Sequence, residues 1–388
     1  MSKICFTANL AWNLTNFRLN HMKAVQSLGI EVHAVAPYDD CVAILEREGI
    51  TYHEWRINRR SLNPFNEIGS IGSLLGIYRR VQPCLVHHYT VKAILYGTIS
   101  ARLCGIPAIV NAVTGMPYII VSPKQSLRGS LARNLSMRWY LWSLAGSDTH
   151  AVFQNLDDVK LVDSFSRKCL ENRSVTRGSG VDLQHFSFQA PIQSRCPIVL
   201  FIGRIIREKG FLELIEAIRI LRATGREFRF KVCGSIDSGN RSSIGIQQVE
   251  RWLEEGLIDR LVKLDDVRPA LAEAEVVVLP SYREGTPRSL LEALAVGRPV
   301  VATDVPGCRE VVRCGINGVL VEPKDSESLA NGIASVLALD AASRGRMGLA
   351  GRRMAEQLFD EKGVIQANLA VYKALAAGSI PEVAGRTV

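Results

Sequence analysis

The stretch over residues 274–305, AEVVVLPSYREGTPRSLLEALAVGRPVVATDV, constrains the fold more than any other part of the chain. Its β-branched apolar run ends at Pro280, as expected for a buried parallel strand. Three leucines then recur at helical spacing, and Gly297 ends the predicted helix before a second apolar run. Strand, helix and strand in this order predict a βαβ unit and therefore a parallel sheet in an α/β domain.

Two carboxylates fall where this unit is expected to meet a ligand. Glu284 lies in the loop after the first strand, and Glu292 lies about one turn into the helix. Ligands of open α/β sheets bind at the carboxyl ends of strands, near helix N-termini. Ionised carboxylates only accept hydrogen bonds, so this pair suits a ligand rich in hydroxyls, such as a sugar with a ribose. A solvated loop glutamate and a helix ion pair between Arg288 and Glu292 are the alternative interpretation.

The same residues carry a resemblance. Glu284 and Glu292 match the E-x7-E motif of the retaining glycosyltransferases of family 4, and PSYREGTPRSLLEALAVGRPVVATDVPGCREVV resembles that family almost residue for residue. The segment REGTPRSLLEA is similar to the bacterial branch that extends polyprenyl-diphosphate-linked sugars or builds surface polysaccharide. The resemblance implies that Glu284 contacts the donor hexose and Glu292 the nucleotide ribose. The bend between them, Gly285, Thr286 and Pro287, can bring backbone close to the same donor.

The resemblance spans nearly the whole chain and implies an α/β protein with the GT-B fold, in which two Rossmann-like doubly wound domains face each other across a cleft. Length agrees, because 388 residues exceed what one hydrophobic core usually supports. We expect an acceptor-binding domain over residues 1–188 and a nucleotide-sugar-binding domain over 189–388, with the polar, proline-containing segment 189–197 as the linker. A C-terminal helix over about residues 355–376 is expected to cross back to the first domain.

Two cations at the start of the second half form a further candidate site. Arg204 ends the apolar run IVLFIGR, and Lys209 stands beside Gly210 directly before a predicted helix. Cations and a glycine at a strand-to-helix turn suit a diphosphate. The GK[ST] ending of a Walker loop is absent. Exposed cations that bind no ligand are the alternative interpretation, because they have the same local sequence. The resembling family shares this GR…EKG arrangement. It implies that Arg204 and Lys209 bind the donor diphosphate and act with Glu284 in catalysis.

The first half alternates apolar strands and helices, but no G-x-G-x-x-G follows its first strand. Asn16 and Arg18 stand in that region as candidates for acceptor or phosphate contacts, with a solvated first-turn arginine as the alternative. His88 and Lys92 follow another predicted strand and are further acceptor candidates. Alternation along a strand would instead send one histidine of the pair His87 and His88 into the core and the other outward.

Thr114 and Gly115 end a later strand, where many members of the resembling family place a functionally important histidine. The departure puts a histidine-assisted mechanism in doubt. It also fits a branch whose acceptor is itself a lipid diphosphate, so Thr114 and Gly115 are kept as acceptor candidates.

The net charge of +9 is concentrated in the first half. Residues 1–190 carry 20 Lys and Arg against 13 Asp and Glu, whereas residues 191–388 carry 27 against 25. A basic half predicts an anionic partner, either a membrane surface or a phosphorylated acceptor, and no nucleic-acid-binding motif is present. Residues 118–145 mix Lys and Arg with Leu and Trp, which predicts a helix at an anionic bilayer surface; a core-packed helix with a basic outer face has the same composition.

No apolar run reaches the roughly 20 residues that span a bilayer, and the start MSKICFTANLAWN lacks a signal-peptide cleavage region. The sequence therefore predicts a cytoplasmic protein, peripheral at the inner face of the plasma membrane. The nine cysteines form no CxxC pair and the seven histidines no HExxH spacing, so we expect free thiols, no metal and no cofactor.

These observations lead to one main hypothesis and two rivals. The main hypothesis is retaining transfer of a hexose or N-acetylhexosamine from a nucleoside diphosphate sugar, taken as UDP-linked, to a hydroxyl of a lipid-linked saccharide. A nucleotide-sugar epimerase of the same fold would act without an acceptor. A non-catalytic subunit of a glycan assembly complex is suggested by the missing histidine and disfavoured by the presence of all four charged donor-site candidates.

Overall fold

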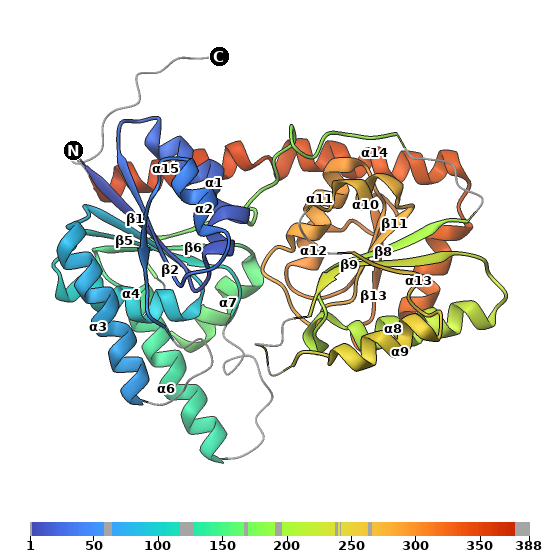
Figure 1. Ribbon diagram of the computed structural model, residues 1–388, viewed down its shortest axis with the longest axis horizontal. Helices are drawn as coiled ribbons and strands as arrows, with labels where there is room; N and C mark the ends of the chain where they lie inside the picture. Colours follow the sequence, from blue (N-terminus) through green and yellow to red (C-terminus); the bar gives the residue numbers. More distant parts are fainter. Residues whose placement is uncertain are drawn as a thin grey trace. The chain divides into compact units, whose positions relative to one another are not determined.

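The computed structural model describes residues 2–57, 64–116, 127–166, 170–190, 196–236, 240, 242–262 and 266–376. Its contacts divide the chain into two compact units: unit 1 holds Met1–Ser179 with Val364–Val388, and unit 2 holds Gly180–Gly363. Each unit is built on a parallel sheet with helices on both faces (Figure 1). Residues 117–126 of the predicted membrane-facing segment and 191–195 of the predicted linker lie outside the described residues.

Unit 1 contains a seven-stranded sheet in the order β3-β2-β1-β4-β5-β6-β7, with every neighbouring pair parallel. The strands are β1 (Lys3–Thr7), β2 (Glu31–Ala36), β3 (Thr51–Glu54), β4 (Leu85–Tyr89), β5 (Ala108–Val113), β6 (Thr149–Phe153) and β7 (Arg173–Val175). The helices are α1 (Ala11–Gln26), α2 (Val42–Arg47), α3 (Pro64–Val81), α4 (Val91–Leu103), α6 (Leu127–Leu144), α7 (Leu156–Phe165) and α15 (Glu361–Leu375).

Both faces of the unit 1 sheet are covered, because successive side chains of a strand point to opposite faces. In β1, Ile4 and Phe6 pack with α1, α2 and α15, whereas Cys5 packs with α3 and α4 on the other face. Helices α3, α4 and α6 lie next to one another on that second face (Figure 1). A strand with helices on both sides has no solvated face, which explains why its residues read as a continuous apolar run.

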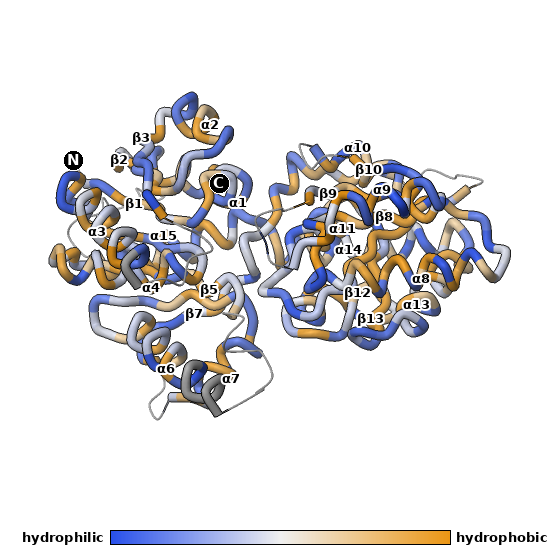
Figure 2. Tube along the Cα trace, turned by 60° about the horizontal axis from the view of Figure 1, so that its bottom comes forward, coloured by the Kyte–Doolittle hydropathy of each residue, from blue (hydrophilic) through white to orange (hydrophobic). Residues whose placement is uncertain are grey.

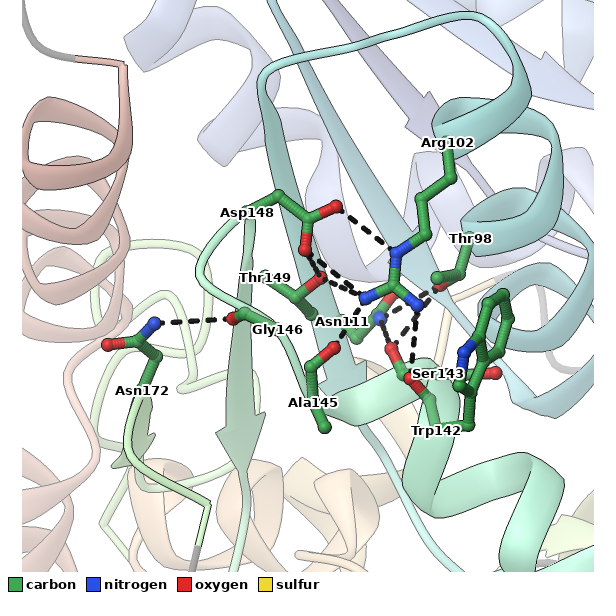
Figure 3. A network of polar contacts seen from close by, with 10 residues as sticks. All are labelled: Thr98, Arg102, Asn111, Trp142, Ser143, Ala145, Gly146, Asp148, Thr149 and Asn172. Carbon is green, nitrogen blue, oxygen red and sulfur yellow. Dashed lines mark hydrogen bonds and ion pairs between the residues drawn. The ribbon is translucent and has the colours of Figure 1, made fainter.

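An arginine network joins the end of α6 to the rest of unit 1 (Figure 3). Arg102, in the last turn of α4, forms an ion pair with Asp148 over 3.1 Å and donates to the carbonyl oxygens of Trp142 and Ala145. These carbonyls lie at or just beyond the C-terminal end of α6, where helical carbonyls have no partner within the helix. The guanidinium therefore caps α6 and holds its last turn against α4 and β6.

Unit 2 contains a six-stranded sheet in the order β10-β9-β8-β11-β12-β13, and its neighbouring strands are also parallel. The strands are β8 (Ile198–Arg204), β9 (Arg229–Ser235), β10 (Arg260–Val262), β11 (Val276–Leu279), β12 (Val300–Thr303) and β13 (Gly318–Val321). The helices are η1 (Arg207–Lys209), α8 (Phe211–Ala223), α9 (Ile246–Glu254), α10 (Arg268–Glu273), α11 (Arg288–Val296), α12 (Cys308–Val311), α13 (Ser326–Ala338) and α14 (Ala341–Leu358).

The predicted βαβ unit is confirmed as β11, α11 and β12. All four residues of β11 and of β12 are buried, and the leucine stripe of α11 is fully buried as well. Gly297 ends α11 in a left-handed conformation, with φ of 84°, as the sequence predicted. Figure 2 shows the hydrophobic residues gathered along such central strands, for example β5 and β12.

The boundary between the units falls at Ser179–Gly180, earlier than the expected boundary between residues 188 and 189. Phe186 lies in the core of unit 2, and Gln189 donates its N–H to the carbonyl of Val296 over 3.1 Å. Arg298 is buried and donates to the carbonyl oxygen of Gln189 over 3.0 Å. The Phe186 side chain and the Gln189 backbone thus have their partners in unit 2, which local composition does not reveal.

The single helix expected over residues 355–376 is two helices. Helix α14 ends at Leu358, and α15 begins at Glu361. The break occurs where the chain pairs with the connector from unit 1: Val181 donates its N–H to the carbonyl of Phe359 over 2.8 Å. From Val364 the chain belongs to unit 1, and Tyr372 of α15 lies in its core.

Candidate active site

The strand order of unit 2 brings two predicted site residues together. Lys209 follows β8, Glu284 follows β11, and these strands are parallel neighbours whose carboxyl ends share one edge of the sheet. The Nζ of Lys209 lies 2.5 Å from Oε1 of Glu284, although 75 residues separate them in sequence. Their side chains are 20% and 14% exposed, so the pair is shielded from water without being sealed from a ligand.

Close backbone packing holds the turn that carries Lys209 against the loop that carries Glu284. Gly210 has φ of 66°, and a Cβ there would lie 2.0 Å from the carbonyl oxygen of Pro280, so no other residue fits this backbone. The N–H of Tyr282 donates to the carbonyl of Glu208 over 2.9 Å. These contacts fix the spacing between the two loops independently of the lysine–glutamate pair.

A second close approach holds the other side of the Glu284 loop. Gly307 has φ of 82°, and a Cβ there would lie 2.2 Å from the carbonyl oxygen of Gly285. The N–H of Glu284 donates to the carbonyl of Pro306 over 3.2 Å. Cys308 follows directly, and burial raises the pKa of its thiol, so a neutral thiol lies under this loop.

Arg204 lies at the same edge of the sheet as Lys209. It is the last residue of β8, its side chain is exposed, and its register partner on β9 is Ser235. The bend predicted to approach a donor follows Glu284: Gly285 and Pro287 are buried, Thr286 is half-buried, and Pro287 precedes the first turn of α11. The donor-binding roles of these residues stay predictions.

Glu292 combines the two interpretations that its spacing left open. Its Oε1 accepts from Nε of Arg288 over 2.9 Å, which is the helix ion pair, and the two side chains are only 12% and 17% exposed. Burial raises the pKa of Glu292, and the neighbouring Arg288 guanidinium offsets part of that rise. So little exposure is unusual for a carboxylate in a solvated helix ion pair. The contact of Glu292 with a ribose stays a prediction.

In unit 1, the alternative of a solvated Arg18 is wrong. Arg18 lies in the second turn of α1, is 7% exposed, and places its guanidinium carbon 4.3 Å from the ring centroid of Tyr89. A stacked, nearly buried guanidinium keeps its charge, so Arg18 supplies a positive potential from beneath the end of β4.

The expectation that one histidine of the β4 pair faces outward is also wrong, since both His87 and His88 are buried. His88 Nδ1 lies 2.8 Å from Oδ1 of Asn111, and its Nε2 lies 3.0 Å from the hydroxyl of Tyr78. Helices cover both faces of the sheet, so successive side chains of β4 point into the hydrophobic cores on its two faces and neither reaches solvent. His88 is a core residue and takes no part in the candidate site.

The other acceptor candidates of unit 1 lie at separate places on its carboxyl edge. Lys92 is half-buried in the first turn of α4, with Nζ 2.9 Å from Oε1 of Glu67 on α3. Thr114 and Gly115 are half-buried directly after β5. Asn16 is exposed on α1 and donates from Nδ2 to the carbonyl of Trp12 over 3.0 Å.

Sequence reasoning missed the residues that support the lysine–glutamate pair. The Tyr282 hydroxyl donates to Oε1 of Glu213 over 2.6 Å, and Glu208 is bonded to the Ser242 hydroxyl. Lys324 lies with Nζ 4.9 Å from the ring centroid of Tyr282. Each comes from a different loop or helix, and the only signal for them was their place after predicted strands.

Among the described residues, no group of three or more His, Cys, Asp and Glu side chains is arranged to hold a metal ion. Every cysteine in the described ranges is free, and Cys169 lies outside them. No described helix has the length and apolar character needed to cross a membrane. That the protein functions without a metal or cofactor stays a prediction.

Comparison with known proteins agrees with this architecture. A model for glycosyl transferases group 1 matches residues 196–338, and a glycosyl transferase 4-like model matches residues 3–155. Among curated proteins, the chain is 25% identical to the N,N'-diacetylbacillosaminyl-diphospho-undecaprenol alpha-1,3-N-acetylgalactosaminyltransferase of Campylobacter jejuni, over 95% of this chain and 98% of that one. It is 24% identical to the UDP-Gal:alpha-D-GlcNAc-diphosphoundecaprenol alpha-1,3-galactosyltransferase of Escherichia coli, over 71% and 72%.

Solved structures resemble the protein over almost its full length. A glycosyltransferase from Rickettsia africae superposes with a TM-score of 0.76 at 18% identity, covering 97% of this chain and 99% of that one. Anabaena HepE in complex with UDP-glucose gives a TM-score of 0.75 at 17% identity, covering 97% and 100%. The predicted fold class is confirmed as GT-B. With a family model matching each of its two parallel α/β halves, the chain belongs to the glycosyltransferases.

Proposed function

We propose that the protein is a retaining glycosyltransferase that moves a hexose or N-acetylhexosamine from a UDP-linked donor to a hydroxyl of a lipid-linked saccharide. The observation that carries the proposal is the Lys209–Glu284 pair at the carboxyl edge of the unit 2 sheet, with Arg204 at the same edge. A cation suits the donor diphosphate and a carboxylate suits the sugar hydroxyls, so one contact of 2.5 Å joins the two halves of the expected donor site.

The names of the related proteins support this choice of substrates. The Campylobacter relative is named for a saccharide on diphospho-undecaprenol, and the Escherichia coli relative for UDP-Gal and a diphosphoundecaprenol-linked acceptor. The HepE structure holds UDP-glucose. A lipid diphosphate acceptor also agrees with the excess of basic residues in the first half of this chain.

In the proposed reaction, the charged residues stabilise the departing nucleoside diphosphate. An ammonium group has three N–H donors, and Glu284 uses one of the three on Lys209, which leaves donors for phosphate oxygens. Arg204 would add a planar guanidinium at the same edge. Donors fixed before the reaction stabilise charge that develops in the transition state, and this electrostatic term is usually the largest in such catalysis.

The carboxylates have alignment roles in the same proposal. Glu284 orients the hexose and Glu292 the ribose, which places the anomeric carbon for attack. The bond from that carbon to the diphosphate oxygen breaks, and a bond to the acceptor hydroxyl oxygen forms on the same face. The acceptor proton passes to the departing diphosphate, so no side chain has to accept it.

A transfer assay separates this function from its rivals. The purified protein is incubated with labelled UDP- and GDP-sugars, with and without a polyprenyl-diphosphate-linked saccharide. Release of nucleoside diphosphate only with acceptor, together with a longer lipid-linked glycan, is the expected result, and EDTA should leave the rate unchanged. Conversion of the donor without acceptor would identify an epimerase. No reaction over the whole donor and acceptor panel would favour a non-catalytic subunit.

We also propose that α6 brings unit 1 to an anionic membrane at the inner face of the plasma membrane. Leu135, Trp139 and Trp142 repeat at helical spacing and are 58%, 39% and 46% exposed. Met137 and Tyr140, on the opposite face of α6, pack in the core of unit 1. The exposed apolar residues therefore form a second stripe that the fold itself does not need. Large apolar side chains exposed along one face are typical of helices at a bilayer interface. The Trp142 ring lies against Arg102 of α4, whose charge is paired with Asp148, so the aromatic side chains and not this arginine supply the proposed contact (Figure 3).

Substituting both exposed tryptophans of α6 by alanine should weaken binding to anionic vesicles by at least about tenfold, because the two rings together lose more than about 1.4 kcal/mol of apolar burial. Sedimentation with phosphatidylglycerol-containing vesicles measures the effect. Trp12→Ala, which removes an exposed tryptophan from α1, is the matched control and should bind vesicles like the wild type. Equal binding by all three proteins would contradict the role of α6.

A further inference from the structure

Two exposed aromatic side chains lie at the carboxyl edge of the unit 1 sheet, on segments that follow neighbouring strands. Trp12 lies in the first turn of α1, which follows β1, and is 38% exposed; Tyr38 lies in the loop after β2 and is 69% exposed. Single exposed apolar residues are common and need no explanation. Two aromatic rings on adjoining segments, at the edge where open α/β sheets bind ligands, do need an explanation.

The carboxylate of Asp39 joins the first turn of α1 to the loop after β2. Helix α1 has Leu10 at its N-cap, so it has no capping side chain of its own. Asp39 of the β2 loop caps the helix instead, because its Oδ2 accepts from the N–H of Trp12 over 2.9 Å while its Oδ1 accepts from the N–H of Cys41 over 3.0 Å. The backbone of Trp12 is thereby fixed beside the residue that follows Tyr38.

The tryptophan ring is also held in place. Trp12 and Phe17 meet edge to face, with ring centroids 5.1 Å apart and an interplanar angle of 85°. An aromatic ring that is braced by one neighbour and still 38% exposed loses little conformational entropy when a ligand covers it. Trp12 has the properties of a stacking platform.

The polar groups around the ring suit hydroxyl-rich ligands. Asn13 is half-buried, and its side chain makes no hydrogen bond within the described part of the chain; Asn16 lies one turn further along α1 and is exposed. The Asn13 amide can therefore donate to or accept from a sugar hydroxyl, whereas Asn16, whose Nδ2 donates to the Trp12 carbonyl oxygen and Thr15 Oγ1, offers its Oδ1 as an acceptor. Directly after the neighbouring strand β4, Thr90 at the N-cap of α4 has φ of 78°, which is strained for a β-branched residue and is typical of functional edges.

We infer that Trp12 and Tyr38 form a saccharide subsite on unit 1 that binds the sugar portion of the acceptor by stacking, with Asn13 and Asn16 bonding to its hydroxyls. This inference rests on the proposed function for the identity of the ligand. Aromatic rings combined with adaptable amides recognise an amphipathic ring better than they recognise a prenyl chain, which needs no hydrogen bonds. The nearby carboxylate of Asp39 is committed to two backbone N–H groups, so it braces the subsite.

Fluorine NMR on the full-length protein tests the subsite directly. The chain has five tryptophans, which 5-fluorotryptophan labels together and Trp→Phe variants assign one by one. The Trp12 signal should shift when farnesyl-diphosphate-linked N-acetylglucosamine is added and stay unchanged with farnesyl diphosphate alone. Trp55 and Trp252, which are buried, serve as internal references. An equal shift with farnesyl diphosphate alone, a shift with anionic vesicles, or no shift would overturn the inference.

A kinetic comparison gives the second test. Trp12→Ala should raise the KM for the lipid-linked acceptor about tenfold and leave the KM for the donor unchanged, while Trp12→Phe keeps most of the affinity. Leu103→Ala, at an exposed position at the end of α4, is the matched control and should have an unchanged KM in an assay with the short-chain acceptor. A parallel rise in both KM values, or none, would overturn the inference. Absence of transfer by the wild type would refute the proposed function, and the fluorine titration would still decide the subsite.

Discussion

Replacing Lys209 by alanine is expected to lower kcat by about 10²–10³-fold, the cost of removing one preorganised donor to a developing anion. The ammonium group of Lys209 is the proposed link between the donor diphosphate and Glu284, with Nζ 2.5 Å from the carboxylate oxygen. Its removal takes away charge stabilisation and also leaves Glu284 without the partner that orients it. Steady-state kinetics with donor and lipid-linked acceptor measure the loss, which should fall mainly on kcat because the charge grows in the transition state.

The fold should survive the substitution. The turn that carries Lys209 is held through backbone contacts of Gly210 and Tyr282 that do not involve the lysine side chain. Circular dichroism and the melting temperature should therefore stay close to those of the wild type. Lys23→Ala is the matched control, because Lys23 forms a lysine–glutamate pair of 2.7 Å with Glu48 on the surface of unit 1. Near-normal turnover by the Lys209 variant, or an equal loss in both variants, would refute the assignment.

The convergence of Lys209 and Glu284 on one site was predictable from the resemblance, which assigned both residues to the same donor. Local rules also identify β8 and β11 as buried strands. Their direct contact was not predicted, because it depends on β8 and β11 being neighbours in the sheet, and local sequence does not give that strand order. The backbone contacts that fix the pair were not predictable, because the positive φ of Gly210 becomes a requirement only when Pro280 lies against it.

The errors share one physical cause, which is that long-range packing decides what local periodicity leaves open. Strand alternation places His87 and His88 on opposite faces of β4 correctly, but it does not say that helices cover both faces. Phe186 follows a polar turn and looks like part of the first domain, yet its partners are in unit 2. Asp39 caps α1 from another loop, a contact that no capping pattern near Leu10 announces.

Acid is expected to destabilise unit 1 strongly, because three of the four buried histidines in its described part, His21, His87 and His88, have no carboxylate partner, whereas His33 lies beside Glu31. Burial lowers the pKa of His88 to about 4, with the hydrogen bond to Asn111 partly opposing the shift. Burial and the nearby Arg18 lower the pKa of His21 to about 3. His87 lies well below its usual pKa, mainly through burial and also through its neighbours His21 and Arg18. In each case a charged imidazole would lose its hydration without gaining a carboxylate partner.

The direction of the effect follows from linkage. The unfolded chain binds protons as the pH falls below about 6.5, whereas the native histidines stay neutral until about pH 4 or lower. These histidines therefore leave the stability unchanged above neutral pH. The stability decreases as the pH is lowered from about 6.5 to about 4. At pH 5 each histidine should cost about 2 kcal/mol of the free energy of unfolding, an order-of-magnitude figure that for three histidines approaches the stability of a typical domain.

Denaturant titrations at pH 7 and pH 5 measure this loss, and hydrogen exchange of the β4 amides reports on unit 1 separately from unit 2. His88→Gln removes one of the three groups while an amide can still pair with Asn111 or Tyr78, so the pH-dependent loss should shrink by about 2 kcal/mol. His185→Gln, at an exposed position in unit 2, is the matched control and should keep the wild-type pH dependence. Equal protection of β4 at both pH values would contradict the prediction. Histidines that stay neutral in the native state but become protonated in the unfolded chain must favour unfolding at pH 5.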